Sequence, residues 1–108
     1  MKALSIRQPW AGMIADGVKT VEIRSWRTNH RGPLLVCAGS RPYRGMKSAG
    51  PFGCALCVVD VIDCRPATAD DAEPAGAEPP DGSFAWVLSA PRPVDQTPVK
   101  GRLGLFDV

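Results

Sequence analysis

Residues 17–26 read Gly-Val-Lys-Thr-Val-Glu-Ile-Arg-Ser-Trp, and they combine a helix stop, a turn and a short strand. Neighbouring side chains of a strand point to opposite faces, so Val21 and Ile23 share one face that suits a hydrophobic core. The other face carries polar and aromatic side chains, namely Thr20, Glu22, Arg24 and Trp26, with Lys19 just before the strand. Two charges and an indole cost solvation free energy if they are buried without partners. We therefore expect this face to line a binding cleft.

The size of the chain predicts one domain, 1–108, with enough residues for a real core. No apolar run approaches the length of a membrane span, so we expect a soluble protein without a membrane partner. The N-terminus enters a strand-like pattern at Lys2 and does not have the features of a signal peptide. These features predict a cytoplasmic location and leave the oligomeric state open.

Charge is distributed unevenly along the chain. Residues 1–53 carry nine lysines and arginines against two acids, a net charge of +7, whereas residues 54–108 carry four against nine, a net charge of −5. Five of those acids lie between residues 70 and 81. A basic half beside an acidic segment favours an anionic partner, such as nucleic acid or a phosphorylated small molecule. A solvated mixed surface is the alternative, and charge alone does not separate the two.

The four cysteines are at positions 37, 54, 57 and 64. The Cys54–Cys57 pair has the spacing of a metal or redox pair, but it lies in a β-type run, where residues three apart face opposite sides. A zinc pair normally lies on a tight knuckle, and His30 is the sole histidine. We therefore expect buried free thiols, with no metal site and no cofactor.

Periodicity and turn residues predict five or six strands and one good helix. The helix begins near Pro9 and stops at Gly17. The expected strands are 2–8, 20–26, 34–38, 54–64, 83–89 and 99–106. Residues 41–53 are an ill-defined connection, and the acidic, Pro- and Ala-rich loop at about 66–82 has no apolar periodicity and is expected to be mobile. The fold class is α+β: a small β-barrel with one N-terminal helix and short helical turns.

An ordered set of motifs resembles the ASCH domain, a family of the PUA-like superfamily. The matching stretches are Leu4-Ser5-Ile6-Arg7-Gln8-Pro9-Trp10-Ala11, Gly17-x-Lys19-x-x-Glu22-x-Arg24-x-Trp26, Arg31-Gly32-Pro33-Leu34-Leu35, Gly53 to Cys64, Phe84-x-Trp86-Val87-Leu88 and Pro98-Val99-Lys100-Gly101. The resemblance implies a PUA-like β-barrel whose cleft is lined by the Gly-x-Lys-x-x-Glu-x-Arg motif. It also implies nucleic-acid binding, with RNA slightly favoured over DNA.

The candidate nucleic-acid-binding residues are cations, an acid, an amide and two indoles: Arg7, Gln8, Trp10, Lys19, Glu22, Arg24, Trp26, Arg31 and Lys100. Lys19 and Arg24 suit phosphate, and Trp26 suits base stacking. Glu22 either accepts from a base amino group or only orients its two cationic neighbours. Trp10 has a core alternative, and Arg31 and Lys100 are equally consistent with plain solvation.

Two other classes of function stay open. One is a hydrolase acting on RNA or on acylated cytidine, with Lys19, Glu22 and Asp60 as the catalytic candidates. In the family branch that removes acyl groups from cytidine, a threonine nucleophile stands where this chain has Glu22, which argues against that mechanism. The other class is a protein-interaction module of a coregulator type.

Overall fold

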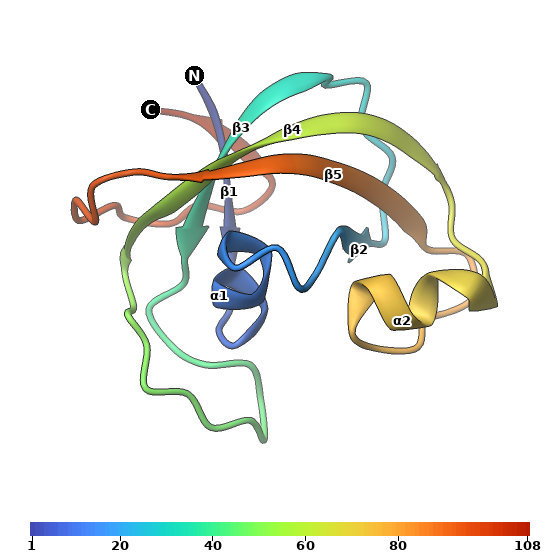
Figure 1. Ribbon diagram of the computed structural model, residues 1–108, viewed down its shortest axis with the longest axis horizontal. Coiled ribbons are helices and arrows are strands. Elements are labelled where there is room, and N and C mark those ends of the chain that lie inside the picture. The colour runs from blue at the N-terminus through green and yellow to red at the C-terminus, as the bar shows by residue number, and fades with distance from the viewer.

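The computed structural model describes all 108 residues, which form a curled six-stranded half-barrel with two short helices (Figure 1). The strand order is β2-β5-β4-β3-β1-β6. The elements are β1 (Lys2–Ile6), α1 (Trp10–Ala15), β2 (Val21–Arg24), β3 (Gly32–Ala38), β4 (Cys54–Pro66), the 3₁₀ turn η1 (Ala69–Asp71), α2 (Ala72–Ala75), β5 (Phe84–Pro93) and β6 (Leu105–Asp107). The expected α+β fold class, with a curled sheet of five or six strands and an N-terminal helix, is confirmed.

The N-terminal unit β1–α1–β2 follows its sequence signals closely. The helix α1 ends at Asp16, and Gly17 takes the left-handed conformation, with φ of +77°, that lets the chain leave the helix. The backbone N–H groups of Val18 and Lys19 then donate to the Met13 carbonyl, so the turn before β2 is held against the helix. The Gly-x-Lys-x-x-Glu-x-Arg motif thereby runs from the end of α1 through the turn and along β2, an edge strand of the sheet.

Most neighbours in the sheet are antiparallel, and the exception is the parallel pair β1 and β3. The main core lies between α1 and the sheet, where Ile14 packs with strand residues such as Leu4 and Val36. Trp86 of β5 is fully buried at the centre of this core. A smaller cluster around Ala3 and Phe106 covers the other face of the strands near β6. Residues 34–38 are buried throughout, as expected for a strand that is covered on both faces.

All four cysteines are buried free thiols, which confirms that prediction, but strand alternation was the wrong reason for Cys54 and Cys57. The register of β3 against β4 shifts between Val36 and Cys37, which leaves Leu56 as an extra residue in β4. Because a bulge reverses the alternation of side chains beyond it, Cys54 and Cys57 enter the same hydrophobic core. Burial raises the pKa of the Cys57 thiol to about 11.

The expectation of a segment without regular structure was wrong for residues 69–75, which form η1 and α2. Both carboxylate oxygens of Asp71 accept from the Arg65 guanidinium at 2.8 Å, and Asp71 Oδ2 also accepts from the Thr68 N–H at 2.8 Å. Ala75 is fully buried in a small cluster with Val21 of β2. Short-range periodicity does not reveal this segment, because its order comes from one ion pair and from packing on a distant strand.

The expected closing strand at 99–106 was wrong for residues 99–104, because β6 comprises only Leu105–Asp107. Other boundaries differ less from expectation. The strand β5 continues to Pro93 rather than ending at Ser89, and residues 41–53 contain no helix. The helices have six and four residues, so none is long enough to span a membrane.

Candidate functional site

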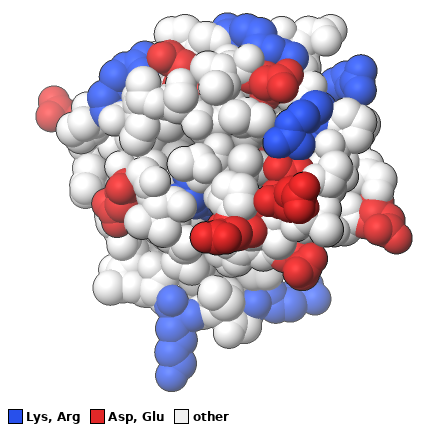
Figure 2. Space-filling view, turned by 45° about the vertical axis from the view of Figure 1, so that its right-hand side comes forward, with Lys and Arg blue, Asp and Glu red and all other residues white.

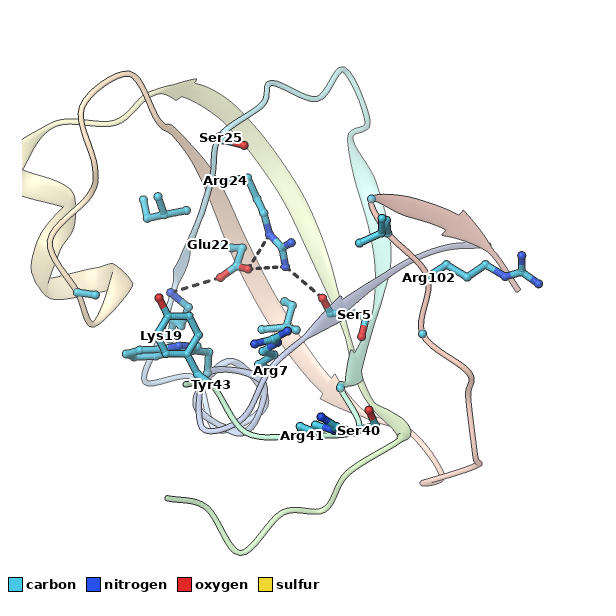
Figure 3. Close-up of a pocket in the computed structure, with 18 of the residues that line it drawn as sticks. Ser5, Arg7, Lys19, Glu22, Arg24, Ser25, Ser40, Arg41, Tyr43 and Arg102 are labelled. Atoms are coloured by element: carbon cyan, nitrogen blue, oxygen red, sulfur yellow. Dashed lines mark hydrogen bonds and ion pairs between the residues drawn. The ribbon is translucent and has the colours of Figure 1, made fainter. Parts of the chain in front are cut away.

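A cavity of about 1010 Å³ opens between the N-terminal unit, α2 and two connecting segments, residues 39–53 and 99–104. We call it the basic cavity. Its charged lining residues are six cations and two acids: Arg7, Lys19, Arg24, Arg41, Lys100, Arg102, Glu22 and Glu78. Apart from Glu78, they fall into two groups: a connected cluster at the start of β2 and along it, and a set of separate cations, of which Figure 3 labels Arg7, Arg41 and Arg102. The two groups differ in burial and in partners.

The connected group is the polar cluster, which consists of Lys19, Glu22 and Arg24. Glu22 Oε1 lies 3.4 Å from Lys19 Nζ, and Glu22 Oε2 accepts from Arg24 Nε at 3.0 Å and lies 2.9 Å from Arg24 Nη2. Arg24 Nη2 also donates to the Ser5 carbonyl at 3.2 Å, which ties β2 to the end of β1 (Figure 3). The three residues thus form one ion-paired unit that bridges two strands which are not neighbours in the sheet.

Lys19 is the most buried cation of the cavity, with 5% of its surface exposed. Its ammonium donates to the Ala75 carbonyl at the end of α2 and lies 5.3 Å from the centre of the Trp10 ring. Burial lowers the pKa of Lys19, and the adjacent Glu22 carboxylate offsets part of that effect. The amine is therefore held by protein groups on several sides and presents little free surface to a ligand.

Glu22 is equally enclosed, with 6% of its surface exposed and both carboxylate oxygens engaged by cations. These contacts favour orientation of Lys19 and Arg24 over reading of a base amino group. A buried carboxylate between two cations also removes the cost of leaving those cations unpaired.

The second group is the rim, which consists of Arg7, Arg41, Lys100 and Arg102. All four side chains are exposed, and none makes an ion pair or a side-chain hydrogen bond. Figure 3 shows Arg7 near the middle of the cavity opening, with Arg41 and Arg102 farther out. The rim therefore carries the positive charge that the protein itself leaves uncompensated.

The segment 99–104 is held against the strands by close backbone contact. The Val99 N–H donates to the Gly53 carbonyl at 3.0 Å, and a Cβ on Gly101 would lie only 2.7 Å from Ser5 Oγ. Since only glycine avoids that clash, the Val99-Lys100-Gly101 motif fits where the segment crosses β1. This crossing places Lys100 and Arg102 on the opposite side of the cavity from α2.

Two aromatic rings form the apolar wall of the basic cavity. Trp10, at the start of α1, meets Tyr43 edge-to-face with ring centres 6.1 Å apart, and 49% of Tyr43 is exposed. The sequence patterns did not indicate Tyr43, because it lies in the ill-defined connection. The signal that could have found it is its position between Arg41 and Arg44, where an aromatic ring alternates with cations.

Four of the residues predicted from sequence do not line the cavity. Trp26 packs edge-to-face on Trp86 at 4.8 Å, because β2 ends at Arg24 and strand alternation does not continue to residue 26. Gln8 is 1% exposed and donates to the Pro51 carbonyl, so it holds a loop.

The other two lie elsewhere on the surface. Arg31 donates to the carbonyls of Thr28 and His30. Asp60 pairs with Arg92 at 3.0 Å and is absent from the cavity lining, so the structure does not bring it to Lys19 and Glu22.

Acidic side chains gather on the face that carries α2, with basic ones mostly toward the edges of that face (Figure 2). The exposed acids of this segment, Asp70, Glu73, Glu78 and Asp81, belong to residues 66–82, and Glu78 lines the cavity itself. The negative half of the chain therefore borders the positive cavity.

Comparisons with known proteins agree with the fold and the motifs. The sequence model described as "ASCH domain" matches residues 4–98. The chain is 35% identical to Activating signal cointegrator 1 of Mus musculus and 32% identical to that of Homo sapiens, over 91% of this chain in both cases. It spans about a fifth of the length of these curated relatives, since 20% of each is covered.

Solved structures show the same architecture. The crystal structure of one mutant of the ZmASCH protein from Zymomonas mobilis aligns with a TM-score of 0.71 over 99% of this chain and 88% of that one, at 14% identity. A second mutant of the same protein aligns with a TM-score of 0.67, over 99% of this chain and 87% of that one, also at 14% identity. At this identity the likeness supports the fold alone.

Proposed function

Since this chain belongs to the ASCH domain family, we propose that its basic cavity binds nucleic acid, with RNA slightly favoured over DNA. The observation that carries the proposal is the uncompensated rim: four exposed cations without partners surround an opening that has an aromatic wall. The family is commonly RNA-binding, which supports the preference for RNA.

In this proposal the two groups of charged residues have different tasks. Phosphates bind to the rim, where Arg7, Arg41, Lys100 and Arg102 are free to donate to phosphate oxygens. A base enters beside the Trp10–Tyr43 wall, where stacking on an aromatic ring contributes about 1–3 kcal/mol. The polar cluster forms the floor: its two cations and one carboxylate leave a net charge of only +1, so it contributes shape and hydrogen-bonding groups more than attraction.

The test is fluorescence anisotropy with short labelled RNA and DNA oligonucleotides at several salt concentrations. The wild-type protein is expected to bind in the micromolar range, with affinity that falls steeply with salt. The variant Arg7→Ala/Lys100→Ala removes two rim cations. The slope of the logarithm of its binding constant against the logarithm of salt concentration, called the salt slope, is expected to fall in magnitude by about 1.4. The control Lys2→Ala/Arg92→Ala removes the same charge outside the cavity lining and should keep the slope. Absence of salt-dependent binding by the wild type would refute the proposal.

A second candidate is hydrolysis of RNA or of acylated cytidine, and one observation favours it. Burial lowers the pKa of Lys19, which is the perturbation expected of a lysine that acts as a base. Against it, Glu22 is fully engaged, Asp60 is elsewhere, and Thr20 is exposed outside the basic cavity. Incubation with labelled RNA and with acylated cytidine tests this candidate, and activity that is unchanged in Lys19→Ala would exclude this site.

A further inference from the structure

The connection between β3 and β4 carries cations and exposed large apolar side chains, and most of them lie outside the cavity lining. We call residues 41–52 the basic–aromatic loop. Arg41, Arg44 and Lys47 alternate along it with large apolar side chains, which are Tyr43 (49% exposed), Met46 (40%) and Phe52 (37%). Its three cations have no ion-pair or hydrogen-bond partner in the structure. Exposed apolar side chains that are gathered in one segment and flanked by polar groups are typical of an interaction site.

The loop is fixed at two points by one buried residue, through its backbone at one point and its side chain at the other. Gln8 is 1% exposed; its backbone carbonyl accepts from the Tyr43 N–H at 2.7 Å, and its Nε2 donates to the Pro51 carbonyl at 2.9 Å. Gln8 Oε1 accepts from the Gly12 N–H at 2.8 Å, which locks the amide against α1. Figure 1 shows the segment extending away from the sheet on the side of α1. Gln8 is thus a positioning residue for the loop rather than a ligand contact.

The loop is continuous with the basic cavity. Arg41 and Tyr43 line the cavity, whereas Arg44, Met46 and Lys47 do not. A chain molecule that has one unit in the cavity can therefore leave it along the loop and meet further cations and rings. A mononucleotide in the cavity would leave those groups uncovered.

We propose that the basic–aromatic loop continues the cavity into an extended groove for single-stranded nucleic acid of several nucleotides. Cations interspersed with large apolar side chains, two of them aromatic, match a strand whose phosphates and unstacked bases are both accessible. A duplex hides its base faces, so it meets only the cations of this loop. The inference rests on the proposed function, because it extends the same site from one nucleotide to a polymer.

The test compares ligand length in wild-type protein and in Arg44→Ala/Lys47→Ala. The probes are a labelled mononucleotide and single-stranded RNA and DNA of about four and about eight nucleotides, a range that single-strand-binding modules occupy. Wild-type affinity is expected to rise at least tenfold from the mononucleotide to the longest strand. In the loop variant the longest strand is expected to bind about tenfold more weakly, with a salt slope lower by about 1.4, and the mononucleotide to bind within twofold of wild type.

The control is Lys2→Ala/Arg92→Ala, which removes equal charge from surface ion pairs outside the loop. If wild type binds the mononucleotide and the longest strand equally well, or if the loop variant keeps wild-type affinity, this inference fails while the proposed function stands. If no nucleotide or oligonucleotide binds, both fail. A poly-glutamate peptide that competes as well as RNA of equal charge would assign the loop to an acidic protein segment and would overturn the inference.

Discussion

The two sides of the basic cavity use the same residue types for opposite purposes. On the β2 side, Lys19 and Glu22 are 5% and 6% exposed, and Lys19, Glu22 and Arg24 are all paired with one another. On the side of the two connecting segments, Arg41, Lys100 and Arg102 are exposed and unpartnered. Buried charges must be compensated within the protein, whereas exposed charges keep their hydration until a ligand replaces it. Paired charges therefore hold the cavity in shape, and unpaired charges are available for binding.

The largest expected effect is a loss of stability when Glu22, which pairs with both cations of the polar cluster, is neutralised. Glu22→Gln leaves the Lys19 ammonium buried without its carboxylate, which should cost about 3 kcal/mol of unfolding free energy. Urea denaturation measures the loss. The matched control is Glu78→Gln, an exposed acid that lines the same cavity and should change stability by less than about 0.5 kcal/mol. Equal losses in the two variants would remove the distinction between the two sides.

The next effect is a loss of stability when Gln8, which holds the basic–aromatic loop, is truncated. Gln8→Ala leaves the Gly12 N–H and the Pro51 carbonyl without their partners, and we expect a loss of about 2 kcal/mol. Gln96→Ala changes an exposed glutamine and should be nearly neutral. Thermal denaturation checks both variants, and hydrogen exchange of the Tyr43 amide should accelerate only in Gln8→Ala. Because the variant keeps the backbone carbonyl that accepts from the Tyr43 N–H, an unchanged Tyr43 amide would mean that the side chain of Gln8 does not position the loop.

A smaller effect, dependent on pH, belongs to the segment that supports α2. Hydrogen bonds from Arg65 lower the pKa of Asp71 to about 2, below its ordinary value near 4 in an unfolded chain. The contribution is therefore fully present above pH 4 and is lost as the pH falls from 4 to 2. Because Arg65 is 42% exposed, we expect only about 1 kcal/mol.

Urea midpoints of wild type and Asp71→Asn measured from pH 5 down to pH 2 test this linkage. The two proteins should differ most at pH 5 and converge at pH 2. Asp70→Asn, an exposed neighbour, should follow wild type throughout. A constant gap between wild type and Asp71→Asn across this range would rule out the proposed titration.

The smallest expected effect tests whether the acidic segment opposes ligand binding. Deletion of the segment would remove the Ala75 carbonyl that accepts from Lys19, so neutralisation is the cleaner change. Replacing Asp70, Glu73, Glu78 and Asp81 by their amides should tighten oligonucleotide binding about two- to fivefold at low salt and leave it unchanged at high salt. Anisotropy titrations at both salt levels measure the change, and equal affinities at low salt would contradict the idea.

Local patterns in the sequence predicted the parts of this fold that depend on near neighbours. The helix stop at Gly17, the strand that carries Glu22 and Arg24, and the buried strand from Leu34 to Ala38 all follow from periodicity and backbone preference. The ordered motifs then identified the family, which supplied the barrel topology. For the site, the motif located the polar cluster, and the candidates Arg7, Trp10 and Lys100 line the same cavity, while their contact with a ligand stays a prediction.

The errors at Trp26 and Asp60 share one cause, which is contact between distant parts of the chain. Trp26 was assigned to the cavity by alternation, but its ring is drawn to Trp86, sixty residues later. Asp60 was grouped with Lys19 through family resemblance, yet it pairs with Arg92 on the neighbouring strand. Neither partner can be inferred from local spacing, because strand register and bulges decide which residues meet.

The amino-acid order alone thus determines which residues carry charge, which segments form strands and where the first helix ends, because these properties depend on side-chain chemistry and local backbone preference. The tertiary structure decides which charged side chains are paired within the protein and which remain without a partner. Glu22 pairs with Lys19, which precedes β2, and with Arg24 on β2 itself, and Arg65 pairs with Asp71. The rim cations have no partner. The physical reason is burial: only folding fixes which charges lose water, and those charges must find partners inside the protein.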